Sequence, residues 1–157
     1  MVLEKYQAKR RFKKTPEPQG RGLKVSKNRF VVQKHSATHL HYDFRLELPE
    51  KFKAGGVVLK SWAVPKGIPP KAGLKHLAVL VEDHPVNYLN FSGIIPKGHY
   101  GAGKVEIWDK GKFKLLALTS KSLKFELKGK KLKGGYVLFN FKGKNWLIFK
   151  MINKASS

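Results

Sequence analysis

Apolar and polar residues alternate in short segments along most of this chain. From Arg29 onward, Gly or Pro interrupts the alternation at intervals of about 8 to 15 residues, which is typical of strands joined by tight turns. No long window keeps the 3.6-residue period of a helix, although Leu115–Leu123 is compatible with a short one. The predicted strands are Arg29–Gln33, His39–Leu48, Val57–Ala63, Leu77–Glu82, Lys104–Asp109, Lys124–Lys128, Tyr136–Phe141 and Trp146–Met151.

The spacing of these strands predicts a mostly β fold, a compact barrel or sandwich with antiparallel strands and few short helices. The Lys- and Gly-rich segment Lys128–Gly135 fits a hairpin loop. Residues 1–28 carry nine cations and end close after the turn-rich Pro16–Gly22, so we assign them to a basic N-terminal arm. Residues 29–153 form the single predicted domain, and residues 154–157 a frayed tail.

The composition limits the classes of protein that this chain can be. Its 157 residues are 41% hydrophobic and 11% aromatic, which is enough for one core and excludes disorder along the whole length. The longest apolar run, Leu77–Val81, is far shorter than the roughly 20 residues of a membrane-spanning helix, and the N-terminus lacks a secretory signal. We therefore expect a cytoplasmic protein without membrane contact. The absence of cysteine excludes disulfides, thiolate nucleophiles and Cys-bearing zinc sites.

The chain is strongly basic, with 33 Lys plus Arg against 10 Asp plus Glu and a formal charge of +23. Such a charge destabilises a compact domain by self-repulsion and is usually matched by a polyanionic partner, so nucleic acid is the favoured partner. Most of the cations are Lys, which act as point charges and favour contact with the nucleic-acid backbone over reading of bases. A Lys-coated surface kept for solubility is the competing explanation.

One predicted strand has an unusual polar face. In His39–Leu48 the odd-numbered positions are polar and contain no Lys, whereas the even-numbered positions are apolar and predicted to face the core. Neighbours on one face of a strand lie close enough for His41 and Asp43 to share one metal ion. His35 can supply a third ligand if the chain turns back at Ser36–Thr38. Two imidazoles and a carboxylate suit a divalent first-row metal such as Mn, Fe or Zn.

Two further segments carry chemistry, each with a simpler alternative. Val81–Tyr88 joins the carboxylates Glu82 and Asp83 to the imidazole of His84, which are suited to orienting cations or histidine tautomers, or to forming surface ion pairs with Lys. The Gly-rich Gly93–Gly103 can present backbone N–H groups to a phosphate, but tight turns are the favoured interpretation.

Several motifs occur in a fixed order along the chain. They are Gln33-Lys34-His35, Leu40–Glu47, Lys60–Gly67, Val81–Pro85 with Tyr88, and Ile95–Gly98 continuing through Tyr100 and Gly101 to Trp108 and Asp109. Over roughly residues 10 to 151 the chain resembles the 3′-phosphoesterase module of bacterial DNA ligase D, which also occurs as a stand-alone protein in archaea and bacteria. The resemblance implies a manganese-dependent β-barrel enzyme of non-homologous end joining. Such an enzyme removes a 3′-terminal ribonucleoside from DNA and then the 3′-phosphate, leaving a 3′-hydroxyl for a separate ligase and polymerase.

The resemblance also implies roles for individual residues. Those matching the metal ligands of the family are His35, His41 and Asp43. Those matching its phosphate and catalytic contacts are Arg45, His84 and Tyr88, with Gln33, Lys66 and Glu82 in support. In the arm, Arg10 and Glu17 match an N-terminal element of the family that contributes to the active site. Arg11 replaces an acid of that element, and His76 stands where a basic residue is common.

The residues leave parts of the mechanism open. No covalent nucleophile with an evident base is present, so either water or a ribose 2′-hydroxyl attacks the phosphate. His84 either donates a proton to the leaving oxygen or stabilises the developing charge. Two rival functions also remain. A non-haem iron oxygenase would use His41 and Asp43 with a distal His84 or His99. A non-catalytic basic barrel would grip single strands through Lys and aromatic side chains.

Overall fold

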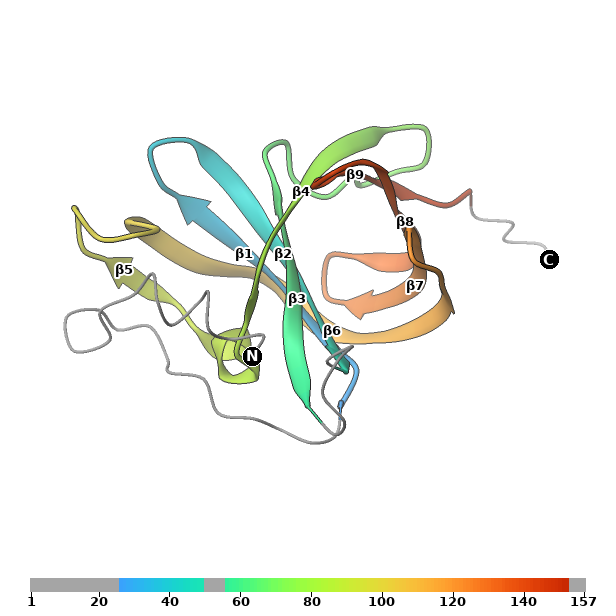
Figure 1. Ribbon diagram of the computed structural model, residues 1–157, viewed down its shortest axis with the longest axis horizontal. Coiled ribbons are helices and arrows are strands. Elements are labelled where there is room, and N and C mark those ends of the chain that lie inside the picture. The colour runs from blue at the N-terminus through green and yellow to red at the C-terminus, as the bar shows by residue number, and fades with distance from the viewer. Residues whose placement is uncertain (1–25, 50–55, 153–157) are drawn as a thin grey trace.

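The computed structural model describes residues 26–49 and 56–152. The predicted arm therefore lies almost entirely outside the described residues, and the predicted tail lies outside them altogether. The strands are β1 Arg29–Ser36, β2 Leu40–Pro49, β3 Val57–Val64, β4 Lys75–His84, β5 Gly93–Ile95, β6 Gly103–Leu118, β7 Ser122–Gly129, β8 Lys133–Lys142 and β9 Asn145–Lys150 (Figure 1). The one helical segment within the described ranges is the short 3₁₀ helix η1, Val86–Asn90. Nothing there forms a helix that is long and apolar enough to cross a membrane.

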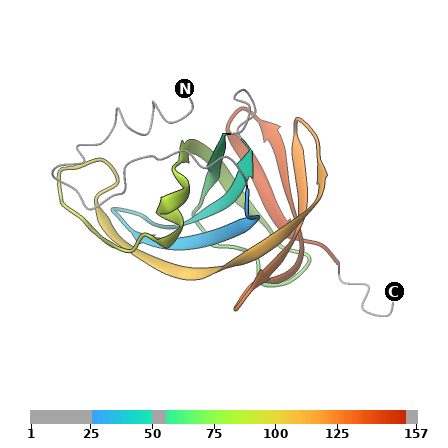
Figure 2. The same ribbon diagram turned by 90° about the horizontal axis from the view of Figure 1, so that it is seen from below.

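The strands close into an antiparallel barrel. Neighbours follow the order β1-β2-β3-β4-β9-β8-β7-β6, and a further pairing of β6 with β1 completes the ring. β5 pairs only with the first residues of β6 and lies outside this ring. Figure 2 shows β6 as a long strand that crosses the whole molecule, from the β5 side to β7. The predicted mostly β fold with antiparallel barrel closure is confirmed.

All eight predicted strands are present, and most of their ends differ by a few residues from the prediction. The exception is β6, which continues to Leu118, well beyond its predicted end at Asp109. The short helix with which the sequence of Leu115–Leu123 is compatible does not form, because β6 continues to Leu118 and β7 begins at Ser122. The Thr119 amide donates to the Ser122 carbonyl at 2.9 Å and closes a hairpin there. A register shift between Leu115 and Ala117 marks a β-bulge, and the apolar residues around it follow one another without alternating with polar ones. This bulge made the segment resemble a helix.

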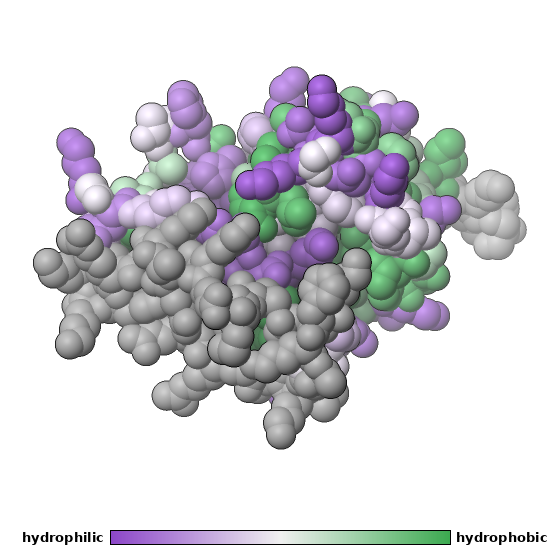
Figure 3. Space-filling model, viewed as in Figure 1, coloured by the Kyte–Doolittle hydropathy of each residue, from purple (hydrophilic) through white to green (hydrophobic). Residues whose placement is uncertain are grey.

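The main hydrophobic core fills the barrel. The even-numbered side chains of β2 from Tyr42 to Leu48 pack in it, whereas Leu40 at the start of the strand is exposed, contrary to the prediction. Phe44 packs on Trp62 and Phe125 with ring centroids 6.4 and 5.7 Å apart. The β7–β8 hairpin predicted from Lys128–Gly135 is confirmed. Its loop is held by Asp109, whose buried carboxylate accepts hydrogen bonds from the amides of Lys130, Lys131 and Leu132. Figure 3 shows hydrophilic side chains over much of the visible described surface, with smaller apolar patches between them.

A second, smaller core lies outside the barrel. There η1 and β5 pack on the outer face of β1, β3 and β6, and the buried residues of this outer core are Val31, Leu59, Tyr88, Leu89, Phe91, Ile95 and Val105. Pro85, with φ of −67°, turns the chain from β4 into η1, and the amide of Phe91 donates to the Tyr88 carbonyl at 3.0 Å to end it. The outer core thus fixes Tyr88 beside the polar face of β2.

Candidate active site

The β1–β2 hairpin places three chelating side chains on the outer face of the barrel. The chain bends at residues 37–39, within one residue of the predicted turn, and His35 and His41 become direct cross-strand partners. Asp43 follows two residues after His41 on the same face of β2. One ligand atom from each side chain lies within 4.8 Å of the other two. The sequence-predicted cluster is therefore assembled by local strand geometry.

The hydrogen bonds of the two histidines orient them toward Asp43. His35 Nε2 lies 2.8 Å from the Gly101 carbonyl, and His41 Nδ1 lies 3.1 Å from the His39 carbonyl. A carbonyl only accepts, so we assign the ring N–H to these nitrogens. The remaining nitrogens, His35 Nδ1 and His41 Nε2, face the carboxylate of Asp43 at 3.5 and 3.3 Å.

A lone pair that faces a carboxylate oxygen at this distance is repulsive unless a proton or a metal ion lies between them. Two imidazoles with their N–H groups bound to backbone carbonyls, and one carboxylate, form a donor set that suits a divalent first-row metal. The residues therefore fit the metal that the sequence predicts, while the identity of that metal is left open by the geometry.

The carboxylate of Asp43 is ionised. Burial raises the pKa of Asp43. The positive charge of Arg45 lowers it by more, together with hydrogen bonds from His35 and His41 when a proton takes the place of the metal ion between them, and the net pKa lies well below the ordinary value. The hydrogen bond with Asp43 in turn raises the pKa of His41 above its ordinary value. The cluster consequently offers an anionic oxygen ligand at neutral pH.

Arg45 extends the site toward the other end of the pocket. Its Nη2 lies 3.4 Å from Asp43 Oδ2, its Nε donates to Gln33 Oε1 at 2.6 Å, and its Cζ lies 4.8 Å from the centre of the Tyr88 ring. Arg45 Nη1 is buried and has no hydrogen-bond partner among the described residues. Leaving a buried charged donor unpaired costs about 1–3 kcal/mol or more, and an oxyanion is the ligand that best satisfies it.

Gln33 connects this arginine to η1. Its amide nitrogen donates to the carbonyls of Tyr88 and Phe91 at 2.9 and 3.0 Å, while its oxygen accepts from Arg45. His84 completes the arrangement, with Nδ1 lying 3.0 Å from the Glu82 carbonyl and its ring at 4.8 Å from that of Tyr88. The β4–η1 corner is thereby held in one position relative to Arg45.

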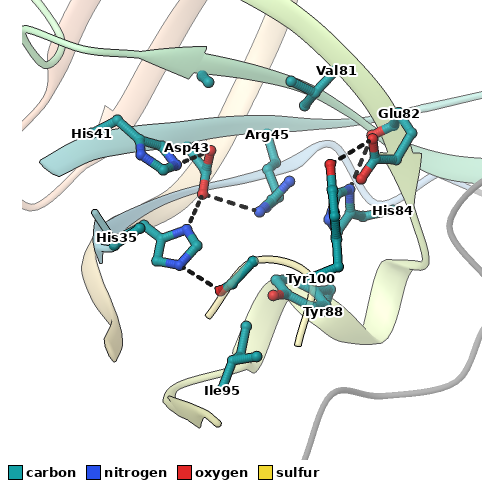
Figure 4. A pocket seen from close by; sticks show the side chains of 13 residues that line it. His35, His41, Asp43, Arg45, Val81, Glu82, His84, Tyr88, Ile95 and Tyr100 are labelled. Carbon is teal, nitrogen blue, oxygen red and sulfur yellow. Dashed lines mark hydrogen bonds and ion pairs between the residues drawn. The ribbon is translucent and has the colours of Figure 1, made fainter. Parts of the chain in front are cut away.

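These groups line one pocket on the outer wall of the barrel, with a volume of about 250 Å³. Figure 4 shows the His35, His41 and Asp43 cluster at one end, Glu82 and His84 at the other, and Arg45 between them. The sequence-predicted residues that line the pocket are His35, His41, Asp43, Arg45, Glu82, His84 and Tyr88. The volume is suited to a phosphate and its sugar rather than to a longer piece of nucleic acid.

Other predicted residues lie elsewhere. Gln33 is buried behind Arg45, and Lys66 is exposed in the turn after β3, outside the pocket lining. His76 Nδ1 lies 2.6 Å from the Gly67 carbonyl, away from the pocket. Arg10 and Glu17 lie outside the described residues. The imidazole that joins His41 and Asp43 is His35, so the structure does not assemble the iron-oxygenase alternative with His84 or His99.

The loop between β5 and β6 contributes two residues that the sequence did not predict as part of the site. Tyr100 lines the pocket, with its hydroxyl 3.5 Å from Glu82 Oε2, and Gly101 supplies the carbonyl that orients His35. The favoured turn interpretation is confirmed by the hydrogen bonds from His99 to Pro96 and from Ala102 to His99. A Cβ at Gly103, where φ is +131°, would lie 2.3 Å from the Ser36 carbonyl oxygen, so only glycine fits this close approach.

Comparisons with known proteins agree with this geometry. A profile of the DNA ligase D 3′-phosphoesterase domain matches residues 33–140. The chain is 46% identical over 160 residues to the multifunctional non-homologous end joining protein LigD of Pseudomonas aeruginosa, covering 94% of this chain and 18% of that protein. It is 42% identical over 159 residues to the multifunctional non-homologous end joining DNA repair protein LigD of Mycobacterium tuberculosis, covering 97% of this chain and 20% of that protein.

A similar match, 41% identical over 168 residues, is found with LigD of Mycolicibacterium smegmatis, and covers 99% of this chain and 21% of that protein. The chain thus spans about a fifth of the length of these curated relatives. The profile covers more than half of the chain and includes every candidate ligand of the pocket. This chain belongs to the DNA ligase D 3′-phosphoesterase domain family.

Proposed function

We propose that this chain is a metal-dependent phosphoesterase that heals DNA 3′ ends, removing a 3′-terminal ribonucleoside and then the remaining 3′-phosphate to leave a 3′-hydroxyl. The observation that supports it most strongly is the unpaired, buried Nη1 of Arg45 beside the three-ligand cluster. Two centres of positive charge then converge in one small pocket, where a phosphate carries the opposite charge. The family and the charge of +23 support nucleic acid as the source of that phosphate.

The proposed metal is Mn²⁺, held by His35, His41 and Asp43. When bound, it supplies positive charge to a non-bridging phosphate oxygen. The donor set also accepts iron or zinc, so metal replacement belongs in the test of the proposal.

The protein's own residues supply the remaining chemistry. Arg45 neutralises charge that develops on the phosphate oxygens, which is the largest contribution available in phosphoryl transfer. Since the Nδ1 proton of His84 is directed at the Glu82 carbonyl, Nε2 is the atom that exchanges a proton with substrate. His84 therefore acts as an acid toward the leaving oxygen only when it is doubly protonated. Tyr88 is a hydroxyl donor for the same phosphate.

The other predicted residues have supporting roles in this proposal. Gln33 holds Arg45 against η1, and Glu82 holds the β4 end of the pocket through its contact with Tyr100. Lys66 would contribute positive charge to the substrate from outside the pocket lining. Arg10 and Glu17 of the N-terminal arm are proposed as further contributors to the site. The barrel over residues 29–153 would then form one catalytic unit with that arm.

Direct attack on the phosphate fits the pocket best. No serine or threonine lines it within the described part of the chain, and the sequence contains no cysteine. Water or the 2′-hydroxyl of the terminal ribose is therefore the proposed nucleophile. An all-DNA strand lacks the 2′-hydroxyl and would be trimmed poorly. We place the reaction in the cytoplasm, where a ligase and a polymerase would use the healed 3′-hydroxyl.

The direct test is a time course with three end-labelled primers that end in deoxyribose, in one ribonucleotide, or in a 3′-phosphate. With Mn²⁺ we expect the ribonucleotide primer to lose one nucleoside and then its phosphate, and the phosphate primer to lose its phosphate. A chelator should stop both steps. Equal trimming of the all-DNA primer, or cleavage inside any strand, would return the chain to a general nuclease or a binding module.

A further inference from the structure

Three lysines form a row across neighbouring strands on the outside of the barrel, away from the pocket. Lys112 of β6 is the direct cross-strand partner of Lys128 of β7, and Lys128 is the direct partner of Lys133 of β8. Direct partners project from the same face of a sheet, and all three side chains are exposed. We call Lys112, Lys128 and Lys133 the lysine row.

The lysine row is unfavourable for the isolated protein. Like charges directly opposite each other on neighbouring strands destabilise a sheet, and here two such pairs share Lys128. Strands lie about 4.7–4.9 Å apart, so three positive charges fall within roughly 10 Å. An acid opposite a lysine would avoid this repulsion. Such a pair occurs two residues further along the same strands, where Glu126 is directly opposite Lys114.

The acids near the row do not neutralise it. Asp109 is buried, and its oxygens accept hydrogen bonds from four backbone amides. Glu126 has no ion pair within 4.0 Å among the described residues. None of the three row lysines has an ion pair there either. A ligand with closely spaced negative charges is the partner that would turn this repulsion into attraction.

β6 connects the row to the pocket. The strand crosses the molecule from the β5 side to β7 (Figure 2). Near its start Val105 pairs with His35 of the β1–β2 hairpin, and Lys112 follows seven residues later. Between them, Lys110 donates from Nζ to Asn90 Oδ1 of η1 at 3.0 Å, which places a further cation beside the helix of Tyr88. At about 3.3 Å per residue, Val105 and Lys112 are separated by roughly 20 Å along this twisted strand.

We propose that the lysine row binds the phosphate backbone of the DNA duplex whose 3′ end occupies the pocket. This inference rests on the proposed function for the position of that end. DNA rises about 3.4 Å per base pair, so roughly six base pairs separate the pocket from the row. Lysines act as point charges and cannot stack on bases, so the row is suited to contact with the phosphate backbone. The row should therefore contribute to binding only when the duplex extends at least that far from the 3′ end.

The test compares two triple variants of equal charge change. The first is Lys112→Gln, Lys128→Gln and Lys133→Gln. The matched control replaces three exposed lysines at two other hairpin turns, Lys121→Gln at the β6–β7 turn and Lys142→Gln and Lys144→Gln at the β8–β9 turn. Binding is measured by fluorescence anisotropy with a blunt 16-base-pair duplex whose 3′-hydroxyl ends are already healed.

For the row variant we expect affinity to fall roughly tenfold or more, and the slope of log affinity against log salt to fall by roughly 2 to 3, because each lost phosphate contact releases about 0.9 fewer counterions. The control variant should change both quantities much less. Equal losses in the two variants, or no loss in the row variant, would overturn the proposal.

Thermal unfolding supplies an independent readout. Removing the opposed lysines relieves repulsion, so the row variant should melt at a higher temperature than the wild type at low salt, and this gain should shrink as salt screens the charges. A lower melting temperature would show that the row stabilises the fold instead of serving a ligand.

The same variants separate this inference from the proposed function. Hairpin substrates with stems of 4 and 16 base pairs, each ending in one ribonucleotide, are compared at limiting concentration. The row variant should lose efficiency on the long stem through KM and match the wild type on the short stem. If the wild type processes neither stem but the row still governs duplex binding, the proposed function fails alone. If processing is normal and the row variant binds like the control, the lysine row fails alone.

Discussion

The two faces of β2 are equally buried but are built in opposite ways. On the inner face Phe44 and Leu46 are fully buried among apolar side chains of the barrel. On the outer face Asp43, Arg45 and Glu47 are 6%, 3% and 0% exposed, and each is held by charged or polar partners. Burial alone therefore does not reveal which face performs chemistry. The kind of partner does, because a polar contact leaves directional groups that a ligand can use.

The apolar inner face also explains how the outer face can keep a buried donor without a partner among the described residues. Barrel closure through β1 and β6 gives the fold a core that does not depend on the outer polar groups. Arg45 can then keep one unpaired donor, whose cost of about 1–3 kcal/mol is small beside the burial of several large aromatic residues. We expect substitutions on the two faces to affect different properties.

The largest effect should come from removing a candidate ligand on the outer face. We expect His41→Ala and Asp43→Asn each to lower metal-dependent activity by at least about 100-fold, because several kcal/mol of charge stabilisation is lost. The unfolding free energy of His41→Ala should stay near that of the wild type, since this side chain is partly exposed and outside the core. Primer assays and urea unfolding check the two properties. Near-normal rates in both variants would remove the assigned cluster from the mechanism.

The inner face should respond in the opposite sense. Phe44→Ala removes a fully buried ring that packs between Trp62 and Phe125, and should lower the free energy of unfolding by about 3–5 kcal/mol. Activity per folded molecule should change little at a temperature where the variant remains folded. Phe44→Leu is the matched control, with a smaller loss. A collapse of activity in folded Phe44→Ala would show that the two faces are not separable.

The third effect concerns Gln33, whose side chain connects Arg45 on the outer face of β2 to the helix η1. Gln33→Leu removes the side-chain donor to the carbonyls of Tyr88 and Phe91 and the acceptor of Arg45, while the Tyr88 carbonyl keeps its bond from the Phe91 amide. We expect a loss of about 1–3 kcal/mol in unfolding free energy, together with lower activity because Arg45 and Tyr88 lose their fixed position. Ser61→Ala, which removes one bond to the Leu59 carbonyl beside them, should leave activity unchanged. Comparable activity in both variants would mean that Gln33 does not position the site.

The smallest effect concerns the other ion pair of the outer face. Burial raises the pKa of Glu47, but the hydrogen bonds and the positive charge of Arg29 lower it by more than burial raises it. The net pKa therefore lies below the ordinary value of 4.5. A depressed pKa contributes stability above the unfolded-state pKa, which is lost as pH falls through the folded value. Urea unfolding between pH 7 and pH 3 should therefore decline more steeply for the wild type than for Glu47→Gln. Parallel pH profiles would contradict the assignment.

Much of this arrangement follows from sequence because it is local. The period-two pattern of β2 separates the core face from the polar face, and the short turn after Ser36 brings His35 opposite His41. Both the strands and the candidate three-ligand cluster could therefore be predicted. The false helix at Leu115–Leu123 shows the limit of such patterns. Apolar residues next to a bulge lose their alternation, and only pairing with β7 reveals the strand.

Contacts between distant segments could not be predicted in the same way. Gly101 orients His35 through a backbone carbonyl, which any residue possesses, so its side chain carries no signal. The role of Gln33 likewise depends on η1 lying over β1, a placement set by the outer hydrophobic core. The lysine row emerges only from the registers of three strands, because its members are far apart in a chain that is rich in Lys throughout.

The measurement that tests the central claim most directly is calorimetric titration of Mn²⁺ into the metal-stripped wild type and His41→Ala at neutral pH. The claim is that the outer face of the β1–β2 hairpin holds one functional metal ion. It predicts one ion bound per wild-type chain, with binding abolished or strongly weakened in the variant while its unfolding curve is unchanged. Absence of binding in the wild type, or the same isotherm in both proteins, would contradict it.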